Sequence, residues 1–168
     1  MTVPQIYEIL KAEFTDKILE LDDTVLQPFI KISAAHTATI GRFLRDDERL
    51  QFDYLMCLSG LDLTENLGVV YHFYSMVHNH KLVVHTEVSK EKPEVSSVAM
   101  LWRTADWHER EAYDMLGIRF IQHPDLKRIL LPDDWTGFPL RKDYKQPEFY
   151  NGIRVPHPDQ KEEIDDSE

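Results

Sequence analysis

Apolar residues near the start of the chain recur first at helical and then at strand spacing. Residues 4–14 carry one apolar stripe, and Pro4 suits the first turn of a helix, so they predict an amphipathic helix. Residues 17–21 and 27–32 have the composition of two short strands joined by a polar turn. A second helix is predicted to begin near Thr37.

The middle of the chain predicts one further helical stretch and a long hairpin. Residues 52–58 carry apolar side chains at spacings typical of a helix. Residues 67–77 are rich in β-branched and aromatic residues, and a turn at 79–80 leads into the alternating pattern of residues 81–88. Residues 95–102 fit either a third strand or a helical turn.

Residues 107–144 are dense in charged and aromatic side chains, and they open with a short helix. Asp106 is the predicted N-cap of this helix, and Glu109 follows three residues later, as in a capping box. Gly117 suits the left-handed position that closes a helix. The helix is therefore predicted to span residues 107–116.

The charges of this helix can pair along its surface. Trp107, Glu111 and Asp114 have the spacing of one helix face, and Arg110 is expected to reach Asp114 four residues later. A solvated surface helix with such ion pairs would need no partner protein.

The sequence after Gly117 favours a partner protein. A short apolar element at 118–121, a turn at 123–125 and an apolar run ending at Pro132 precede residues 133–144, which carry large side chains without periodicity. A monomer would cover those aromatic side chains poorly, so we expect the segment to lie on another protein.

The order of elements, α-β-β-α followed by further strands, predicts an α+β fold. We expect a two-layer sandwich, with helices packed on one face of a small mixed β-sheet and an extended irregular C-terminal segment. Three parts are expected: an α+β domain over residues 1–122, an extended partner-binding segment over 123–150, and an acidic tail over 151–168, expected to be disordered.

Composition narrows the range of partners. The 168 residues include 30 acids and 19 bases, a net charge of −11, which argues against binding nucleic acid or anionic lipid directly. We find neither an apolar run of about 20 residues, as a membrane span requires, nor a secretory signal. We therefore expect a cytoplasmic chain whose association with a membrane goes through another protein.

Familiar catalytic and cofactor motifs fail on inspection. His108 and Glu109 would suit a zinc-protease helix only with a second histidine at position 112, which is alanine. Cys57 is the only cysteine, so the chain offers no thiolate set for an iron–sulfur cluster. No glycine-rich phosphate-binding motif is present. We expect no catalytic residue, cofactor site or metal site in this chain.

One long motif does match a known pattern. From Glu109 to Leu130 the sequence reads ERE-x2-DML-x6-H-x3-K-x-IL. It resembles the signature of the C subunit of the proton-translocating NADH:quinone oxidoreductase, also called respiratory complex I or NDH-1, and misses no position of it. The likeness continues through Trp135 and residues 139–144, and more loosely back to the N-terminus.

The resemblance implies a structural subunit of the peripheral arm of that complex, with FMN and iron–sulfur clusters in partner subunits and none in this chain. Its expected partners are the D subunit, which carries the quinone site, and neighbouring iron–sulfur subunits. The expected location is the cytoplasmic side of the inner membrane, without a span of its own. The signature and its flanks supply the expected interface residues: Trp107, Glu109, Arg110, Glu111, Asp114, Gly117, His123, Arg128, Trp135, Arg141, Lys142 and Tyr144.

Two alternatives remain open from the sequence. The chain could be the equivalent subunit of a related complex, either a membrane-bound energy-converting hydrogenase or a quinone oxidoreductase with another electron donor. A free-standing small-molecule enzyme is disfavoured because nucleophile, metal ligands and cofactor loop are all missing.

Overall fold

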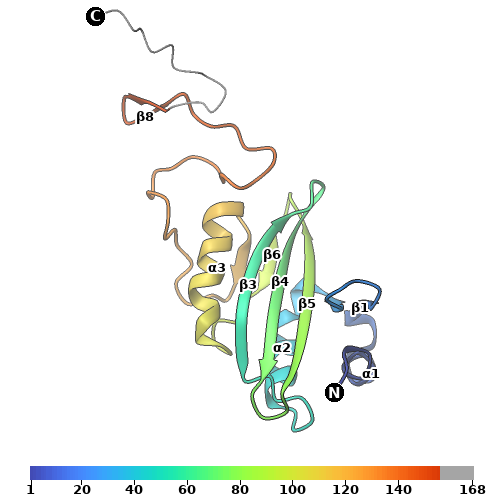
Figure 1. The fold of residues 1–168 in the computed structure, drawn as a ribbon. Helices are drawn as coiled ribbons and strands as arrows, with labels where there is room; N and C mark the ends of the chain where they lie inside the picture. Colours follow the sequence, from blue (N-terminus) through green and yellow to red (C-terminus); the bar gives the residue numbers. More distant parts are fainter. Residues whose placement is uncertain (156–168) are drawn as a thin grey trace, which may run out of the picture.

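The computed structural model describes residues 1–155 and shows three helices packed with a five-stranded sheet (Figure 1). The helices are α1 (Val3–Phe14), α2 (Thr37–Asp46) and α3 (Arg103–Leu116). The sheet strands are β1 (Ile18–Asp22), β2 (Phe29–Ile32), β3 (Tyr54–Asp62), β4 (Asn66–Ser75) and β5 (His80–Ser89). Short pairs are formed by β6 (Glu94–Ser96) with β7 (Arg119–Ile121), and by β8 (Phe149–Tyr150) with β9 (Ile153–Arg154).

The sheet is mixed, as the sequence predicted. Its strand order is β1-β2-β5-β4-β3, in which β2 and β5 run parallel and the other neighbours antiparallel. The α+β class is therefore confirmed. No helix within residues 1–155 is long and apolar enough to cross a membrane.

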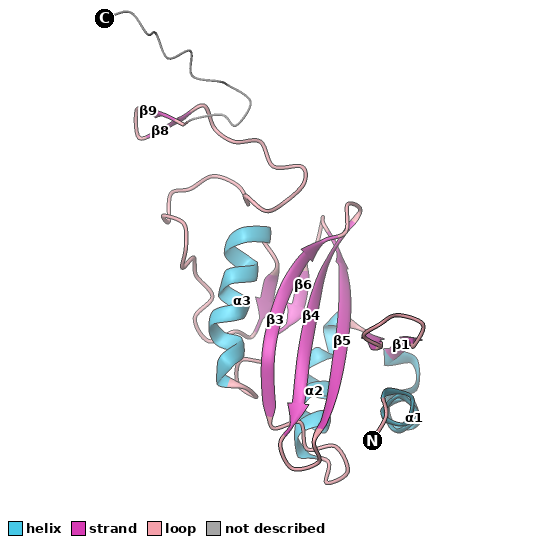
Figure 2. Cartoon of the chain, viewed as in Figure 1, coloured by secondary structure: helices cyan, strands magenta, loops and turns pink. Residues whose placement is uncertain are grey.

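One face of the sheet carries the core. Leu67, Val69, Tyr71 and Phe73, at alternate positions of β4, are buried together with apolar residues of all three helices. Trp102, at the start of α3, lies 4.8 Å from Phe73 between ring centroids. This packing fixes α3 against the sheet, and α3 in turn positions the residues that follow it (Figure 2).

The predicted helix at residues 52–58 is wrong, since most of this stretch belongs to strand β3. A β-bulge between Leu55 and Cys57 adds one residue, so Leu55 and Leu58 both face the core although they are three residues apart. That spacing imitates one face of a helix.

The start of α3 was also predicted wrongly. The helix begins at Arg103, and Trp102 occupies the N-cap position, so Asp106 lies inside the first turn and no capping box forms with Glu109. The buried Trp102 ring donates from Nε1 to the carbonyl of Phe52 at 2.9 Å, which fixes where the chain turns into the helix. The left-handed closing position at Gly117, with φ of 75°, is as predicted.

Gly60 in β3 allows α3 to approach the sheet closely. A Cβ at this position would lie 2.6 Å from Leu116 Cδ1 and 3.3 Å from Ala112 Cβ. We expect Gly60→Val to lower the free energy of unfolding by about 1–3 kcal/mol, measured by urea denaturation, because the branched side chain pushes α3 outward. Ser59→Val, on the exposed face of the same strand, is the control and should change stability by less than about 0.5 kcal/mol. Equal losses in the two variants would contradict this packing.

Candidate functional site

The carboxylate of Asp114, in the last turn of α3, collects the backbone of the segment that follows the helix. Its side chain is fully buried. Oδ2 accepts hydrogen bonds from the successive N–H groups of Ile129, Leu130 and Leu131 at 3.0, 2.7 and 3.0 Å. Oδ1 accepts from the Arg128 guanidinium at 2.7 Å. We call this arrangement the Asp114 anchor.

Arg128 extends the anchor into the next stretch of chain. Its Nη1 also donates to the carbonyl of Asp114, while Nη2 donates to the carbonyls of Trp135 and Gly137 at 3.2 and 3.1 Å. One guanidinium therefore ties α3 to two separate parts of an irregular segment. Burial alone would raise the pKa of Asp114, but the N–H groups of Leu130, Leu131 and Ile129 together with Arg128 hold it below its ordinary value.

A second connection closes over the end of α3. Arg141 donates from Nε to the carbonyl of Leu116 at 2.6 Å, and its guanidinium lies 4.8 Å from the centre of the Phe138 ring. Phe138 packs so near Gly117 that a Cβ there would lie 2.5 Å from the ring. Gly117 thus serves both the left-handed turn and the close approach of Phe138.

Asp62, at the end of β3, provides a third connection. It accepts from the backbone N–H of Lys142 at 2.8 Å and from Nζ of Lys90, while Lys142 Nζ donates to the hydroxyl of Thr64. Burial works against the charged form of Asp62, yet the hydrogen bonds from Lys142, Lys90 and Thr64 lower its pKa to about 2. Sequence reasoning missed Asp62 because nothing local distinguishes it from an ordinary turn aspartate.

Beyond these connections the segment is held by its own aromatic side chains. Trp135 donates from Nε1 to the hydroxyl of Tyr144 at 3.1 Å, and its ring lies 5.0 Å from that of Tyr150. Several large apolar side chains along the segment nevertheless remain more than half exposed: Leu130, Leu140, Phe149 and Ile153. The segment is fixed to the body of the protein while presenting an apolar surface.

Glu109, one turn earlier in α3, is fully buried. Its carboxylate accepts from the Ser97 hydroxyl at 2.6 Å and from the N–H of Val98 at 2.7 Å. Burial is the main cause that raises the pKa of Glu109 to about 7. Nε2 of His123, whose side chain is also fully buried, lies 3.9 Å away.

The structure changes the predicted pairing along α3. Arg110 does not pair with Asp114, whose oxygens are occupied by Arg128 and the backbone N–H groups; instead Arg110 donates from Nε to the carbonyl of Lys127 at 3.3 Å. Its guanidinium lies 5.1 Å from the centre of the Trp107 ring. Trp107 and Glu111 share the spacing of Asp114, but both side chains are exposed.

The histidine side chains of the β4–β5 hairpin form hydrogen bonds with backbone carbonyl groups. A ring nitrogen of His80 lies 2.8 Å from the carbonyl oxygen of Leu50, and one of His78 lies 2.9 Å from that of Glu48. Among residues 1–155, no group of three or more His, Cys, Asp or Glu side chains could hold a metal ion.

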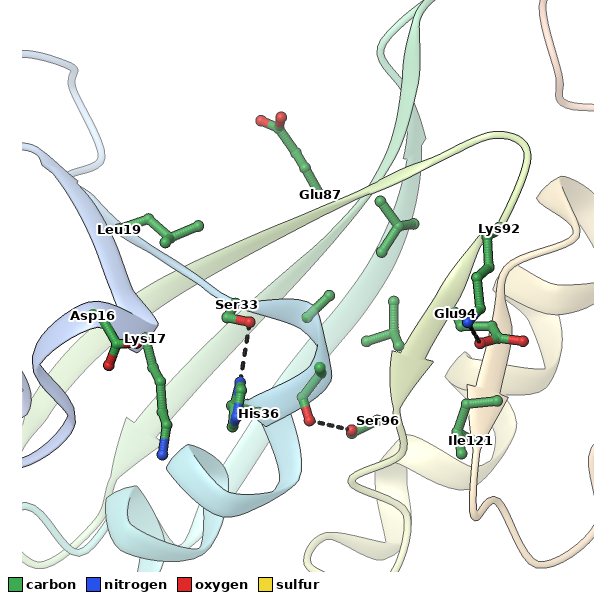
Figure 3. A pocket seen from close by; sticks show the side chains of 14 residues that line it. Asp16, Lys17, Leu19, Ser33, His36, Glu87, Lys92, Glu94, Ser96 and Ile121 are labelled. Carbon is green, nitrogen blue, oxygen red and sulfur yellow. Dashed lines mark hydrogen bonds and ion pairs between the residues drawn. The ribbon is translucent and has the colours of Figure 1, made fainter.

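A groove of about 600 Å³ lies elsewhere, between the β1 end of the sheet and β6 (Figure 3). Several of its polar side chains bond one another or the backbone: Ser33 with His36 at 3.1 Å, Lys92 with Glu94 at 3.4 Å, and Ser96 with a carbonyl at 2.8 Å.

Comparison with known proteins identifies relatives of this arrangement. Residues 30–150 match the family model described as the 30 Kd subunit of respiratory-chain NADH dehydrogenase. The C subunit of the NADH-quinone oxidoreductase of Chloroherpeton thalassium is 53% identical over 90% of this chain, and that of Chlorobium phaeobacteroides is 44% identical, also over 90%.

The lengths of these relatives differ. The chain spans 64% of the Chloroherpeton protein and 93% of the Chlorobium protein. Among solved structures, the trypsin-resistant fragment (1-134) of Nqo5 superposes with a TM-score of 0.57 at 27% identity, covering 75% of this chain and all of the fragment.

The Asp114 anchor can be tested by an isosteric change. In Asp114→Asn, one carboxylate oxygen is replaced by an NH2 group, which must point either toward Arg128 or toward the three backbone N–H groups. In both orientations two hydrogen-bond donors face each other. We expect a loss of about 2–4 kcal/mol in the stability of the segment and trypsin cleavage after Lys127 or Arg128 that is faster by roughly tenfold or more. Glu111→Gln, at an exposed position of the same helix, should leave the cleavage rate unchanged. Wild-type resistance in Asp114→Asn would contradict the anchor.

Proposed function

Because the chain belongs to the family of the 30 Kd subunit of respiratory-chain NADH dehydrogenase, we propose that it is a structural subunit of the peripheral arm of NADH:quinone oxidoreductase. In this proposal the assembled complex passes electrons from NADH through FMN and iron–sulfur clusters to quinone and couples the transfer to proton translocation. This chain supplies none of those groups, and its contribution is positional.

The observation that carries the proposal is the Asp114 anchor. Residues 128–131 contribute three backbone donors and one guanidinium to a single buried carboxylate, so the start of the segment is fixed to α3 before any partner binds. The residues that follow have little regular structure (Figure 2). Several of their apolar side chains are exposed. A segment that is fixed to the body at several points and exposes apolar side chains between them suits an arm that lies on a neighbouring subunit.

The proposed partners of this arm are the quinone-site subunit, which is the D subunit of the complex, and neighbouring iron–sulfur subunits. We assign residues 1–122 to the body, 123–150 to the arm and 151–168 to the tail, of which residues 156–168 lie outside the described part of the chain. The complex would hold the chain at the cytoplasmic side of the inner membrane.

We propose two different roles for residues at and near this interface. One group fixes the arm to the body: Asp114, Gly117, Arg128, Arg141 and Lys142. Exposed side chains are free to touch a partner directly, above all Trp107, Leu140 and Phe149. The side chain of Trp107 is 62% exposed. Tryptophan is one of the residue types that contribute most to binding energy at protein interfaces.

Purification of the complex through a tag at Met1, in mild detergent and with mass spectrometry of the recovered proteins, tests this function. We expect the quinone-site subunit together with the iron–sulfur, flavin and membrane subunits. Leu140→Asp should reduce recovery of the quinone-site subunit by roughly tenfold or more, because a carboxylate must then be desolvated in the interface.

The control for this experiment is Leu26→Asp, an equally drastic change at a fully exposed leucine between β1 and β2. It should leave the recovery unchanged. Recovery of hydrogenase subunits would instead assign the chain to a related complex, and recovery of the chain alone would contradict a structural role.

A further inference from the structure

The exits of β6 and β7 meet at one buried carboxylate. β6 ends at Ser96, and the next two residues donate to Glu109 from the Ser97 hydroxyl and the Val98 N–H. β7 ends at Ile121, and His123 follows it with a fully buried side chain. Glu109 therefore sits where α3, the loop after β6 and the turn after β7 come together.

His123 is oriented so that one N–H faces two carboxylates. The N–H of Asp125 donates to Nδ1 of His123 at 3.0 Å, so Nδ1 must carry a lone pair and the ring proton is on Nε2. Nε2 lies 3.2 Å from the carbonyl oxygen of Asp106, 3.5 Å from Asp106 Oδ1 and 3.9 Å from Glu109 Oε2. A single N–H cannot satisfy all of these acceptors, and Asp106 Oδ1 is buried without a hydrogen bond.

Among the described residues, no lysine or arginine is paired with Glu109. Its own helix contributes the Asp106 carboxylate, the turn after β7 contributes His123, and the loop after β6 contributes only a hydroxyl and an N–H. The charge of Glu109 also acts on the buried hydroxyl of Tyr71 in β4. Within residues 1–155, His123 is the one basic side chain within ion-pair distance of Glu109.

We propose that Glu109 is the proton-binding site of a latch, in which a proton on its carboxyl holds the exits of β6 and β7 against α3 and loss of that proton releases them. The first residues of the segment, 123–125, belong to this latch. Their release would loosen the segment at its start, upstream of the Asp114 anchor. This inference concerns the chain itself and does not depend on the proposed function.

The raised pKa of Glu109 gives the direction and the pH range. Its value moves from the ordinary 4.5 to about 7 in the folded chain, so the closed latch binds the proton more tightly than an open one. The resulting stabilisation is complete below pH 4.5 and is lost as pH rises through 7. By the same linkage, opening the latch near pH 7, where the closed carboxyl is about half protonated, releases about half a proton per chain on average.

Hydrogen exchange of the full chain, followed by NMR at pH 5.5 and 7.5, tests the latch. After correction for the intrinsic rate, the opening constant at the amides of Val98 and Asp125 should rise about 20-fold between these pH values. Amides of β4 should change less than about twofold. An equal opening constant at both pH values would overturn the proposal.

Two variants complete the test. Glu109→Gln can keep the contacts with Ser97 and Val98 but cannot ionise, so the 20-fold rise should disappear; Glu8→Gln, at an exposed position of α1, should behave like the wild type. A rise that persists in Glu109→Gln would overturn the proposal. If that variant does not fold, a carbon-13 titration of the wild-type Glu109 carboxyl decides: an inflection near 7 supports the latch, and one below 5 overturns it.

Discussion

The arrangement of residues 128–137 depends on one buried carboxylate. Asp114 is fully buried and would be costly to ionise in an apolar site, but four hydrogen bonds from the residues that follow compensate it. The dependence is mutual, because three successive backbone N–H groups without a strand or helix would otherwise need water. The carboxylate and the segment therefore stabilise each other, and neither would be stable in this position alone.

The α+β body makes this mutual stabilisation possible by holding α3 in place. Close contact of α3 with β3 at Gly60, and the buried ring of Trp102 against Phe73, fix the helix on the sheet. A helix fixed in this way presents its last turn in a defined position, so Asp114 and Gly117 can direct the chain that follows. The proposed function uses this rigidity to position an arm on a neighbouring subunit, without any chemistry of its own.

The fold class could be predicted from the sequence because strong periodicity and turn signals marked most of its elements. Errors arose where a local pattern had two explanations: the bulge near Leu55 imitated helical spacing, and Asp106 looked like a cap although the burial of Trp102 decides where α3 starts. The sequence pointed to Asp114 and Arg110 as paired charges, but Asp114 pairs with Arg128, and Arg110 bonds the carbonyl of Lys127. Contacts such as that of Asp62 with Lys142 join residues far apart in the sequence, and no local pattern encodes them.

The most direct measurement compares hydrogen exchange of the free chain with that of the chain in the purified complex. Residues 129–131 should be protected in both states, because the Asp114 anchor is internal to the chain. The Lys142 amide, which donates to Asp62, should also be protected in both states. The amides of residues 132–150 without such a bond to the body should gain protection only in the complex, where the arm lies on its partner. Unprotected amides at 129–131 in the free chain, or an arm whose exchange is unchanged by assembly, would contradict the account.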